Sequence, residues 1–389
     1  MRVAFVTPEY AAESPRHGGL GNYVRRMAGA LVAQGHQAEV FVPSRASPGT
    51  SEADGIVVHR VTAAVERRPV RALLRILGRL RATASARALC VAIDAWTLAA
   101  ALRRRSRETR FDLVQSADHK AVALFLPARR APHLLRCCND DAETARRNGV
   151  VMRHRAGEDA LARLALRRAD RVYAPSRFLA MHLERSRGIR VEVLAPPAFL
   201  EVKPLPAPPR GLPERYFVHF GQLTPVKGTA LLCDALLHVF EQQPDLAMVW
   251  AGRDPLGLVE PCLERLGRHR VRVRHLGELT RPELYAVVAG AEASVLPSLF
   301  DNLPNSAIES LLLGVPVIGS DGASLDELVT PGVDGLLVPV GDAAALADAM
   351  LRHWRGESGV RRGFVWQKPE MRPEAAVAGL FALAGLHVD

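Results

Sequence analysis

Short apolar runs alternate with longer amphipathic stretches along the first half of the chain. Residues 2–7 and 35–43 are apolar enough for two buried strands, and between them the apolar residues from Val24 to Leu31 recur at helical spacing. A strand, a helix and a second strand in this order are typical of a parallel sheet. The strand-like pattern recurs three more times, at 111–125, 134–143 and 171–176. We expect the first of these segments to run from its strand into a helix.

The second half of the chain repeats this alternation more regularly. Strands are predicted at 216–221, 246–252, 271–277, 293–298 and 315–320. Helices are predicted near 228–241, 256–267 and 281–289, and after the fourth strand. Each half therefore predicts an α/β domain with its own doubly wound parallel sheet, in which ligands bind at a topological switch point.

A proline-rich segment separates the two halves. Seven prolines between Pro196 and Pro213 leave little room for a helix or a central strand. We therefore predict an N-terminal domain over residues 1–195, a linker over 196–213 and a C-terminal domain over 214–357. The last segment, 358–389, is expected to form a helix that crosses back to the N-terminal domain.

The charge balance of the chain favours anionic partners. Its 389 residues carry a formal net charge of +10, and only four of the 51 basic residues are lysines. A positive field concentrates anions such as nucleotide phosphates or anionic lipid near the surface. A coding sequence of high GC content, which favours arginine codons, would explain the same excess of arginine. Aromatic residues make up 5% of the chain, and we find no stacking platform, so no nucleic-acid partner is expected.

An amphipathic basic helix is predicted at 70–81. Its apolar stripe runs from Val70 to Leu80, and arginines lie four residues apart on another face. Two interpretations stay open, a solvated face of a helix packed on its own domain or docking on an anionic membrane or an acidic acceptor. We find no uncharged apolar run of about 18 residues and no leader pattern. We therefore expect a cytoplasmic protein, with peripheral contact at the inner membrane face as the alternative.

No metal site is predicted. The five cysteines are odd in number and show neither a C-x-x-C spacing nor the histidine arrangement of a zinc site, so they fit reduced thiols. We also find no Asp-x-Asp element that would hold a divalent ion at a diphosphate; the neighbouring pair Asp140 and Asp141 is not one.

Two carboxylates stand out in the segment from Leu296 to Gly314, which combines a strand end, a polar loop and a helix. Asp301 in the loop and Glu309 on the second helical turn lie eight residues apart, so both can reach one cleft. Asn302 is the predicted N-cap of the helix. The glycine that ends the segment suits the left-handed conformation that closes a helix.

Five segments, in this order along the chain, resemble the motifs of one family. They are HGGLGNYVRRMAGALVAQGHQAEVF (17–41), ADRVYAPS (169–176), FGQLTPVKG (220–228), PSLFDNLPNSAIESLLLGVPVIGSD (297–321) and DGLLVP (334–339). The two-domain organisation resembles the GT-B architecture, in which two Rossmann-like domains face each other across a cleft. The motifs of the second half resemble those of the retaining glycosyltransferases of family 4.

The resemblance implies a retaining, metal-independent transfer of a sugar from a nucleotide-diphosphate sugar to an acceptor hydroxyl, with no cofactor besides this co-substrate. The acceptor stays open between a small molecule, a glycan and a lipid. A nucleotide-sugar epimerase of the same fold is one alternative. A non-catalytic protein that binds a nucleotide sugar or an anionic surface is the other.

The resemblance also implies a role for each matching residue on the donor side. Lys227 would stabilise the departing phosphate, and Glu309 would accept hydrogen bonds from the ribose hydroxyls. Gln222 stands where the family often has Arg, so it would donate to phosphate without a charge. The remaining positions implied to bind the donor are Gly18, Gly19, Gly221, Asn305 and Ser306.

Two further positions are implied to act near the transferred sugar. Asp301 occupies the first carboxylate position, where the family more usually has Glu, so we expect it to influence the choice of donor sugar. The family's histidine near the donor sugar does not fall cleanly on a histidine of this chain. His119 lies beside the aligned position, which makes it a candidate catalytic residue.

Overall fold

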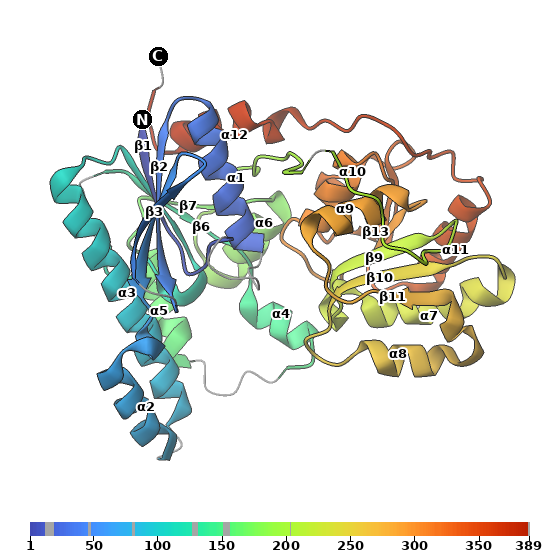
Figure 1. Ribbon diagram of the computed structural model, residues 1–389, viewed down its shortest axis with the longest axis horizontal. Helices are drawn as coiled ribbons and strands as arrows, with labels where there is room; N and C mark the ends of the chain where they lie inside the picture. Colours follow the sequence, from blue (N-terminus) through green and yellow to red (C-terminus); the bar gives the residue numbers. More distant parts are fainter. Residues whose placement is uncertain are drawn as a thin grey trace.

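The computed structural model describes residues 1–11, 19–45, 48–79, 82–126, 131–150, 156–202 and 204–387. This part of the chain forms two α/β domains that lie side by side, each built on its own sheet (Figure 1). The predicted fold class, two doubly wound parallel-sheet domains, is confirmed.

The N-terminal sheet has eight strands. They are β1 (Arg2–Val6), β2 (Gln37–Ser44), β3 (Gly49–Ala53), β4 (Ile56–Thr62), β5 (Leu113–Ala117), β6 (His133–Arg136), β7 (Arg171–Ala174) and β8 (Glu192–Val193). Their order is β3-β4-β2-β1-β5-β6-β7-β8, with an antiparallel pairing only between β3 and β4. The order reverses between β1 and β5, which places the switch point of this sheet there.

Helices cover both faces of the N-terminal sheet. They are α1 (Gly19–Ala33), α2 (Arg68–Arg79), α3 (Thr83–Glu108), α4 (Asp141–Arg147), α5 (Ala156–Leu166) and α6 (Arg177–Arg187). The crossover through α1 leads from β1 to β2, whereas the crossover through α3 leads back from β4 to β5. Because both crossovers are right-handed and run in opposite directions, the two helices lie on opposite faces of the sheet.

The C-terminal sheet has six strands, all parallel. They are β9 (Phe217–Gln222), β10 (Met248–Arg253), β11 (Val273–His275), β12 (Ser294–Leu296), β13 (Val317–Asp321) and β14 (Gly335–Pro339), in the order β11-β10-β9-β12-β13-β14. Its helices are α7 (Thr229–Gln242), α8 (Val259–Leu266), α9 (Arg281–Gly290), α10 (Asn305–Leu312) and α11 (Ala343–Trp354). Two apolar clusters lie on its two faces, one beneath α7, α8 and α11 and the other beneath α9 and α10.

The end of the chain returns to the N-terminal domain. The segment after α11 runs over the C-terminal domain to α12 (Pro373–Leu383), which packs beside α1 (Figure 1). Four side chains of α12 belong to the N-terminal core, namely Ala376, Val377, Leu380 and Phe381. On the way the tail meets the linker, where the backbone N–H of Ala198 donates to the carbonyl oxygen of Met371 at 2.8 Å. The two domains are therefore connected twice.

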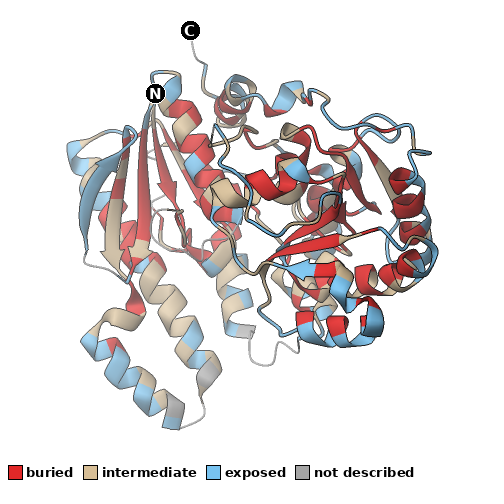
Figure 2. Cartoon of the chain, turned by 45° about the vertical axis from the view of Figure 1, so that its right-hand side comes forward, coloured by how far each residue is buried: buried red, intermediate tan, exposed pale blue. Residues whose placement is uncertain are grey.

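The helical pair α2 and α3 extends from the N-terminal domain. Residues Ala84–Glu108 of α3 are long and apolar enough, by length and composition, to cross a membrane. Of the residues in the apolar stretch of this helix, 28% are buried inside the protein. The second half of α3, however, contributes Leu98 and Leu102 to the core. Figure 2 shows α2 mostly exposed or half-buried, and its Leu73 and Ile76 are 41% and 53% exposed. The predicted basic helix is confirmed, and its contact with a membrane stays a prediction.

One predicted helix is wrong. The segment after β5 forms only a short 3-10 turn from His119 to Ala121, because Lys120 and Ala121 adopt φ angles of 54° and 47° in the left-handed region. This conformation is costly for residues other than glycine and interrupts a helix. Strained backbone of this kind concentrates at functional sites. The turn lines the cleft described below.

We expect Phe381→Ala to lower the free energy of unfolding by about 3–5 kcal/mol, because it opens a cavity in a packed core. Phe381 is 1% exposed, and its ring meets that of His36 edge-on with 5.0 Å between centroids. Urea unfolding measures the effect. The control is Val365→Ala in the same tail, where the side chain is 83% exposed. Equal unfolding midpoints for the two variants would show that α12 is not part of the core.

Candidate active site

A cleft of about 1740 Å³ lies between the two domains. Most of its walls are residues that follow the carboxyl ends of the parallel strands, which is where ligands bind in such sheets. A pocket for one small molecule usually measures about 300–1,000 Å³. The cleft therefore has room for two substrates side by side.

Lys227 and Asp301 form an ion pair on the C-terminal wall. Lys227 ends a 3-10 turn after β9, and its Nζ donates to Oδ2 of Asp301. The carboxylate is 5% exposed, and its Oδ1 accepts from the backbone N–H of Asn302 at 2.9 Å. The family resemblance implies that the two side chains contact different parts of a donor, whereas in this structure they pair with each other.

Gly228 fixes the position of the Lys227 turn. Its φ is +77°, and a Cβ atom at this position would lie 1.9 Å from the carbonyl oxygen of Pro297. No other residue fits a backbone approach this close. Beneath the turn, His219 contacts Thr229 Oγ1 at 2.9 Å and the Val295 carbonyl oxygen at 2.8 Å. Burial, aided by the charge of Lys227, lowers the pKa of His219 to about 4, so this histidine is a neutral support.

Glu309 lies at the centre of a buried charge cluster. Its Oε1 accepts from Arg281 Nη1 at 2.6 Å, from Arg26 Nη2 at 3.1 Å and from the Tyr285 hydroxyl at 3.3 Å. Among the described residues, none donates to its Oε2. One oxygen is therefore held by the protein, and the other can accept hydrogen bonds from a ligand.

Arg26 brings the N-terminal domain into this cluster. It lies on α1, is 3% exposed, and also pairs with Glu201 of the linker at 3.0 Å. Neither Arg26 nor Arg281 was singled out from the sequence. Arg26 lies among many arginines, and nothing in its spacing shows that it faces the other domain.

The amino end of α10 faces the cleft. The helix begins at Asn305, with Pro304 at the cap position and no side-chain cap, so the predicted N-cap Asn302 is wrong. The amide of Asn302 instead donates to the carbonyl oxygen of Cys138 in the other domain. Asn305 and Ser306 line the cleft, and their N–H groups belong to the first turn, which has no acceptor within the helix. Gly314 ends the helix at φ +68°, as predicted.

The remaining donor-side positions come together around this helix. Gly18 lies outside the described residues, and Gly19 begins α1 so close to α10 that a Cβ atom would lie 3.1 Å from Asn305 Nδ2. Gly221 and Gln222 end β9 and line the cleft. Gln222 is register-paired with Arg253 on β10, another cleft residue that the sequence did not single out. A neighbouring strand thus supplies a charge where Gln222 has none.

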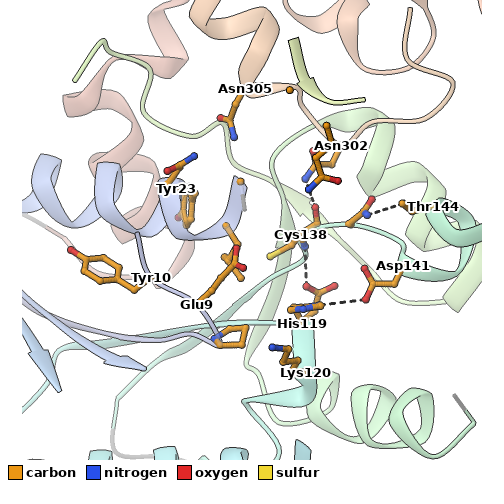
Figure 3. A pocket seen from close by; sticks show the side chains of 18 of the residues that line it. Glu9, Tyr10, Tyr23, His119, Lys120, Cys138, Asp141, Thr144, Asn302 and Asn305 are labelled. Atoms are coloured by element: carbon orange, nitrogen blue, oxygen red, sulfur yellow. Dashed lines mark hydrogen bonds and ion pairs between the residues drawn. The ribbon is translucent and has the colours of Figure 1, made fainter. Parts of the chain in front are cut away.

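His119 lies on the N-terminal wall, next to Asp141 (Figure 3). Its Nδ1 is 3.3 Å from the carboxylate Oδ2, and its side chain is 35% exposed. The contact with the donor-side loop is made instead by Cys138, two residues past the end of β6. Burial lowers the pKa of His119, but the hydrogen bond and the charge of Asp141 raise it by more, so the pKa lies above 6.5.

The loop that carries Asp301 also holds the domains together. The ring of Phe300 lies among residues of the N-terminal domain, with centroids 5.4 Å from Phe178 and 5.1 Å from His182. The carbonyl oxygen of Asn302 accepts from the hydroxyl of Ser176. The donor-side wall and the N-terminal wall therefore meet directly next to the Lys227–Asp301 pair.

Family models cover most of the chain. The model described as "Glycosyl transferase 4-like domain" matches residues 18–198, and the model described as "Glycosyl transferases group 1" matches residues 214–355. The chain belongs to the GT-B glycosyltransferases of the family 4 type. The family resemblance inferred from the motifs is thereby confirmed.

Sequence identities between this chain and individual similar proteins are low. The uncharacterized glycosyltransferase YqgM of Bacillus subtilis is 26% identical over 196 residues, which are 49% of this chain and 54% of the relative, so the match spans about half of its length. Sucrose-phosphate synthase from Thermosynechococcus elongatus has a similar fold, with a TM-score of 0.67, 20% identity and coverage of 98% and 96%. HepE of Anabaena, solved in complex with UDP-glucose, gives a TM-score of 0.60 at 18% identity, with coverage of 98% and 95%.

Glu309→Gln should lower the stability of the glycosyltransferase by about 3–5 kcal/mol, because it leaves the guanidinium of Arg281 without its carboxylate in a buried site. The control is Glu264→Gln, an exposed glutamate on α8. Urea unfolding measures both. In a double-mutant cycle with Arg26→Met we expect a coupling energy of about 1–3 kcal/mol. Strict additivity would mean that Arg26 and Glu309 do not hold the domains together.

The raised pKa of His119 predicts a pH dependence. Because the charged form is favoured in the folded state, the stabilisation is complete below the unfolded pKa of 6.5 and is lost as the pH rises through the folded value. Asp141→Asn should lower the pKa of His119, as followed by an NMR titration of the imidazole. Asp348→Asn, at an exposed position of α11, serves as the control. An unchanged pKa in Asp141→Asn would contradict the assigned partner.

Proposed function

We propose that this protein transfers a sugar from a nucleotide-diphosphate sugar to an acceptor hydroxyl, with retention of the anomeric configuration and without a metal ion. The observation that carries the proposal is the C-terminal wall of the cleft. There a lysine, the amino end of α10 and an available oxygen of Glu309 face one cavity. These are the groups needed for the diphosphate and the ribose of a nucleotide-diphosphate sugar.

The diphosphate is bound by Lys227, Arg253 and the first turn of α10. Cations and helix amino ends stabilise the negative charge that develops on the departing phosphate, and a fixed protein site does so without reorganisation. Gly19 and Gly221 allow the backbone to approach the ligand closely. Gln222 adds a neutral hydrogen-bond donor.

We infer that donor binding replaces the ion pair between Lys227 and Asp301 with contacts to the donor. As the diphosphate binds, Lys227 turns from Asp301 to the phosphate oxygens. The carboxylate of Asp301 is then free to accept from hydroxyls of the donor sugar. The contact of Lys227 with phosphate and the contact of Asp301 with the sugar therefore form together. If only one of them formed, the other charged side chain would be left without a partner in a poorly solvated site.

The ribose hydroxyls donate to Oε2 of Glu309, while Oε1 stays with Arg26, Arg281 and Tyr285. Three donors on one oxygen fix the carboxylate orientation before the nucleotide arrives, which lowers the entropy lost on binding. The complex of HepE with UDP-glucose supports a uridine nucleotide as the first candidate.

The acceptor enters along the N-terminal wall, where His119 and its partner Asp141 lie. Contacts between the domains exclude water from the reacting sugar, which protects it from hydrolysis. Metal independence is supported by the donor set: among the described residues, no three His, Cys, Asp or Glu side chains are grouped to hold a metal ion. Retention is supported by the resemblance to family 4.

A thermal-shift screen of UDP, GDP, dTDP and ADP tests the donor site. The preferred nucleotide should raise the melting temperature with the logarithm of its concentration over Kd. Lys227→Met should weaken its binding about tenfold to a hundredfold, because one charge-assisted hydrogen bond is lost. Lys368→Met is the matched control, since Lys368 lies outside the residues lining the cleft. If no nucleotide shifts the melting temperature, the proposal is wrong.

With the donor known, NMR of the product gives its anomeric configuration, and EDTA treatment tests the metal independence. Inversion or a complete loss of activity after EDTA would each contradict the corresponding part of the proposal. Epimerisation of the donor without an acceptor would indicate the epimerase alternative, and binding without any turnover the non-catalytic one.

A further inference from the structure

Arg136 is a buried arginine on the N-terminal wall of the cleft. It is the last residue of β6, it is 5% exposed, and it is one of the residues that line the cavity. Its backbone is held on both sides, by Ala117 of β5 and by Tyr173 of β7 in the sheet register. The guanidinium is therefore part of the rigid sheet end and not a surface side chain.

The charge of Arg136 has no partner of opposite charge among the described residues. Its Nη1 donates to the Cys138 thiol at 3.4 Å, and its Nε is buried without a hydrogen-bond partner. A guanidinium has five N–H donors, and sulfur is a weak acceptor, so most of its hydrogen-bonding capacity is unused. A buried charge without an ion pair and with few hydrogen bonds lowers the stability of the folded protein.

The described groups that interact with this guanidinium are the Cys138 thiol and two tyrosines, all of them neutral. Its central carbon lies 3.9 Å from the centroid of the Tyr23 ring, whose hydroxyl is tied to Gln115 and Tyr173 at 2.9 Å each. Burial raises the pKa of Tyr23 to about 12 and the pKa of the Cys138 thiol well above 9.0. The ring face attracts the cation without neutralising it.

Arg26 shows by contrast how this fold treats a buried arginine that serves the structure. It is equally enclosed, yet it pairs with two carboxylates, Glu201 and Glu309. Asp118, at the end of the neighbouring strand β5, does not pair with Arg136; its Oδ1 accepts from the backbone N–H of Cys138 at 3.0 Å. Within the described part of the chain Arg136 therefore has no ion pair, which leaves its charge available to an anionic ligand.

The position of Arg136 favours a contact with the acceptor rather than with the donor. Two residues further on, the carbonyl oxygen of Cys138 contacts Asn302, which follows the donor-side carboxylate Asp301 (Figure 3). Arg136 thus lies on the opposite wall from Lys227, close to where the walls meet. Lys120, in its strained turn, is a second cation of this wall, and its charge also acts on the carboxyl of Asp94.

We propose that Arg136 binds an anionic group, a phosphate or a carboxylate, of the acceptor. This inference rests on the proposed function, because it divides one cleft between a donor and an acceptor. A guanidinium matches both anions through paired N–H donors, and its packing on Tyr23 fixes the plane in which they point.

The test is isothermal titration calorimetry of the UDP-saturated protein with glucose 6-phosphate, glucuronate, glucose and inorganic phosphate. Saturation with nucleotide keeps these anions out of the diphosphate site. At least one anionic probe should bind about tenfold or more tightly than glucose. The two sugar acids distinguish a phosphate site from a carboxylate site. If all anionic probes fail to bind, or bind no better than glucose, the proposal is overturned.

Arg136→Met should abolish this preference for the anion, and Arg136→Lys should retain part of it. UDP affinity within about twofold of wild type shows that each variant is folded. The matched control is Arg104→Met, an exposed arginine of α3 outside the cleft. If Arg136→Met keeps the preference, another group binds the anion. If no nucleotide binds to the wild type, the titrations are repeated without it, which separates a failure of the donor site from a failure of the anion site.

Discussion

The structure depends on a carboxylate that two guanidiniums share. Glu309 is buried where the domains meet, and a single charge in such a place would be strongly destabilising. Arg281 from its own domain and Arg26 from the other both reach the same oxygen. The charge balance is therefore complete only when the domains lie together, and the second oxygen is left for a ligand.

The same loop-and-helix unit contributes to both domains. Phe300 packs with the N-terminal core, Asp301 pairs with Lys227, and Asn302 reaches the opposite wall. Of these three consecutive side chains, the first packs in the apolar core, the second forms an ion pair and the third makes a hydrogen bond to the other domain. The donor-side carboxylate Asp301 is therefore flanked on both sides by residues that contact the N-terminal domain.

The sequence predicted the fold class and ten of the fourteen described strands, all but β3, β4, β8 and β14, because buried parallel strands are continuous apolar runs that can be recognised locally. It also singled out Lys227, Asp301 and Glu309 from their spacing and motif context. It did not predict the exposed hairpin of β3 and β4 or the helix α3. Strand β3 is short and polar, and α3 is apolar around much of its surface, so neither shows a clear period.

What the sequence determined by itself was therefore local: the elements, the linker, the helix end at Gly314 and the residues with motif character. What only the tertiary structure decided was which side chains contact one another across the two domains. Asn302 is not a cap because α10 begins only at Asn305 and the Oδ1 of Asn302 accepts from Leu303, while its Nδ2 donates to Cys138. Arg26 belongs to the site because it reaches Glu309 on α10, and Arg136 has an unpartnered Nε at a strand end that faces the cleft. Such contacts join residues more than a hundred positions apart, and no periodicity along the chain encodes them.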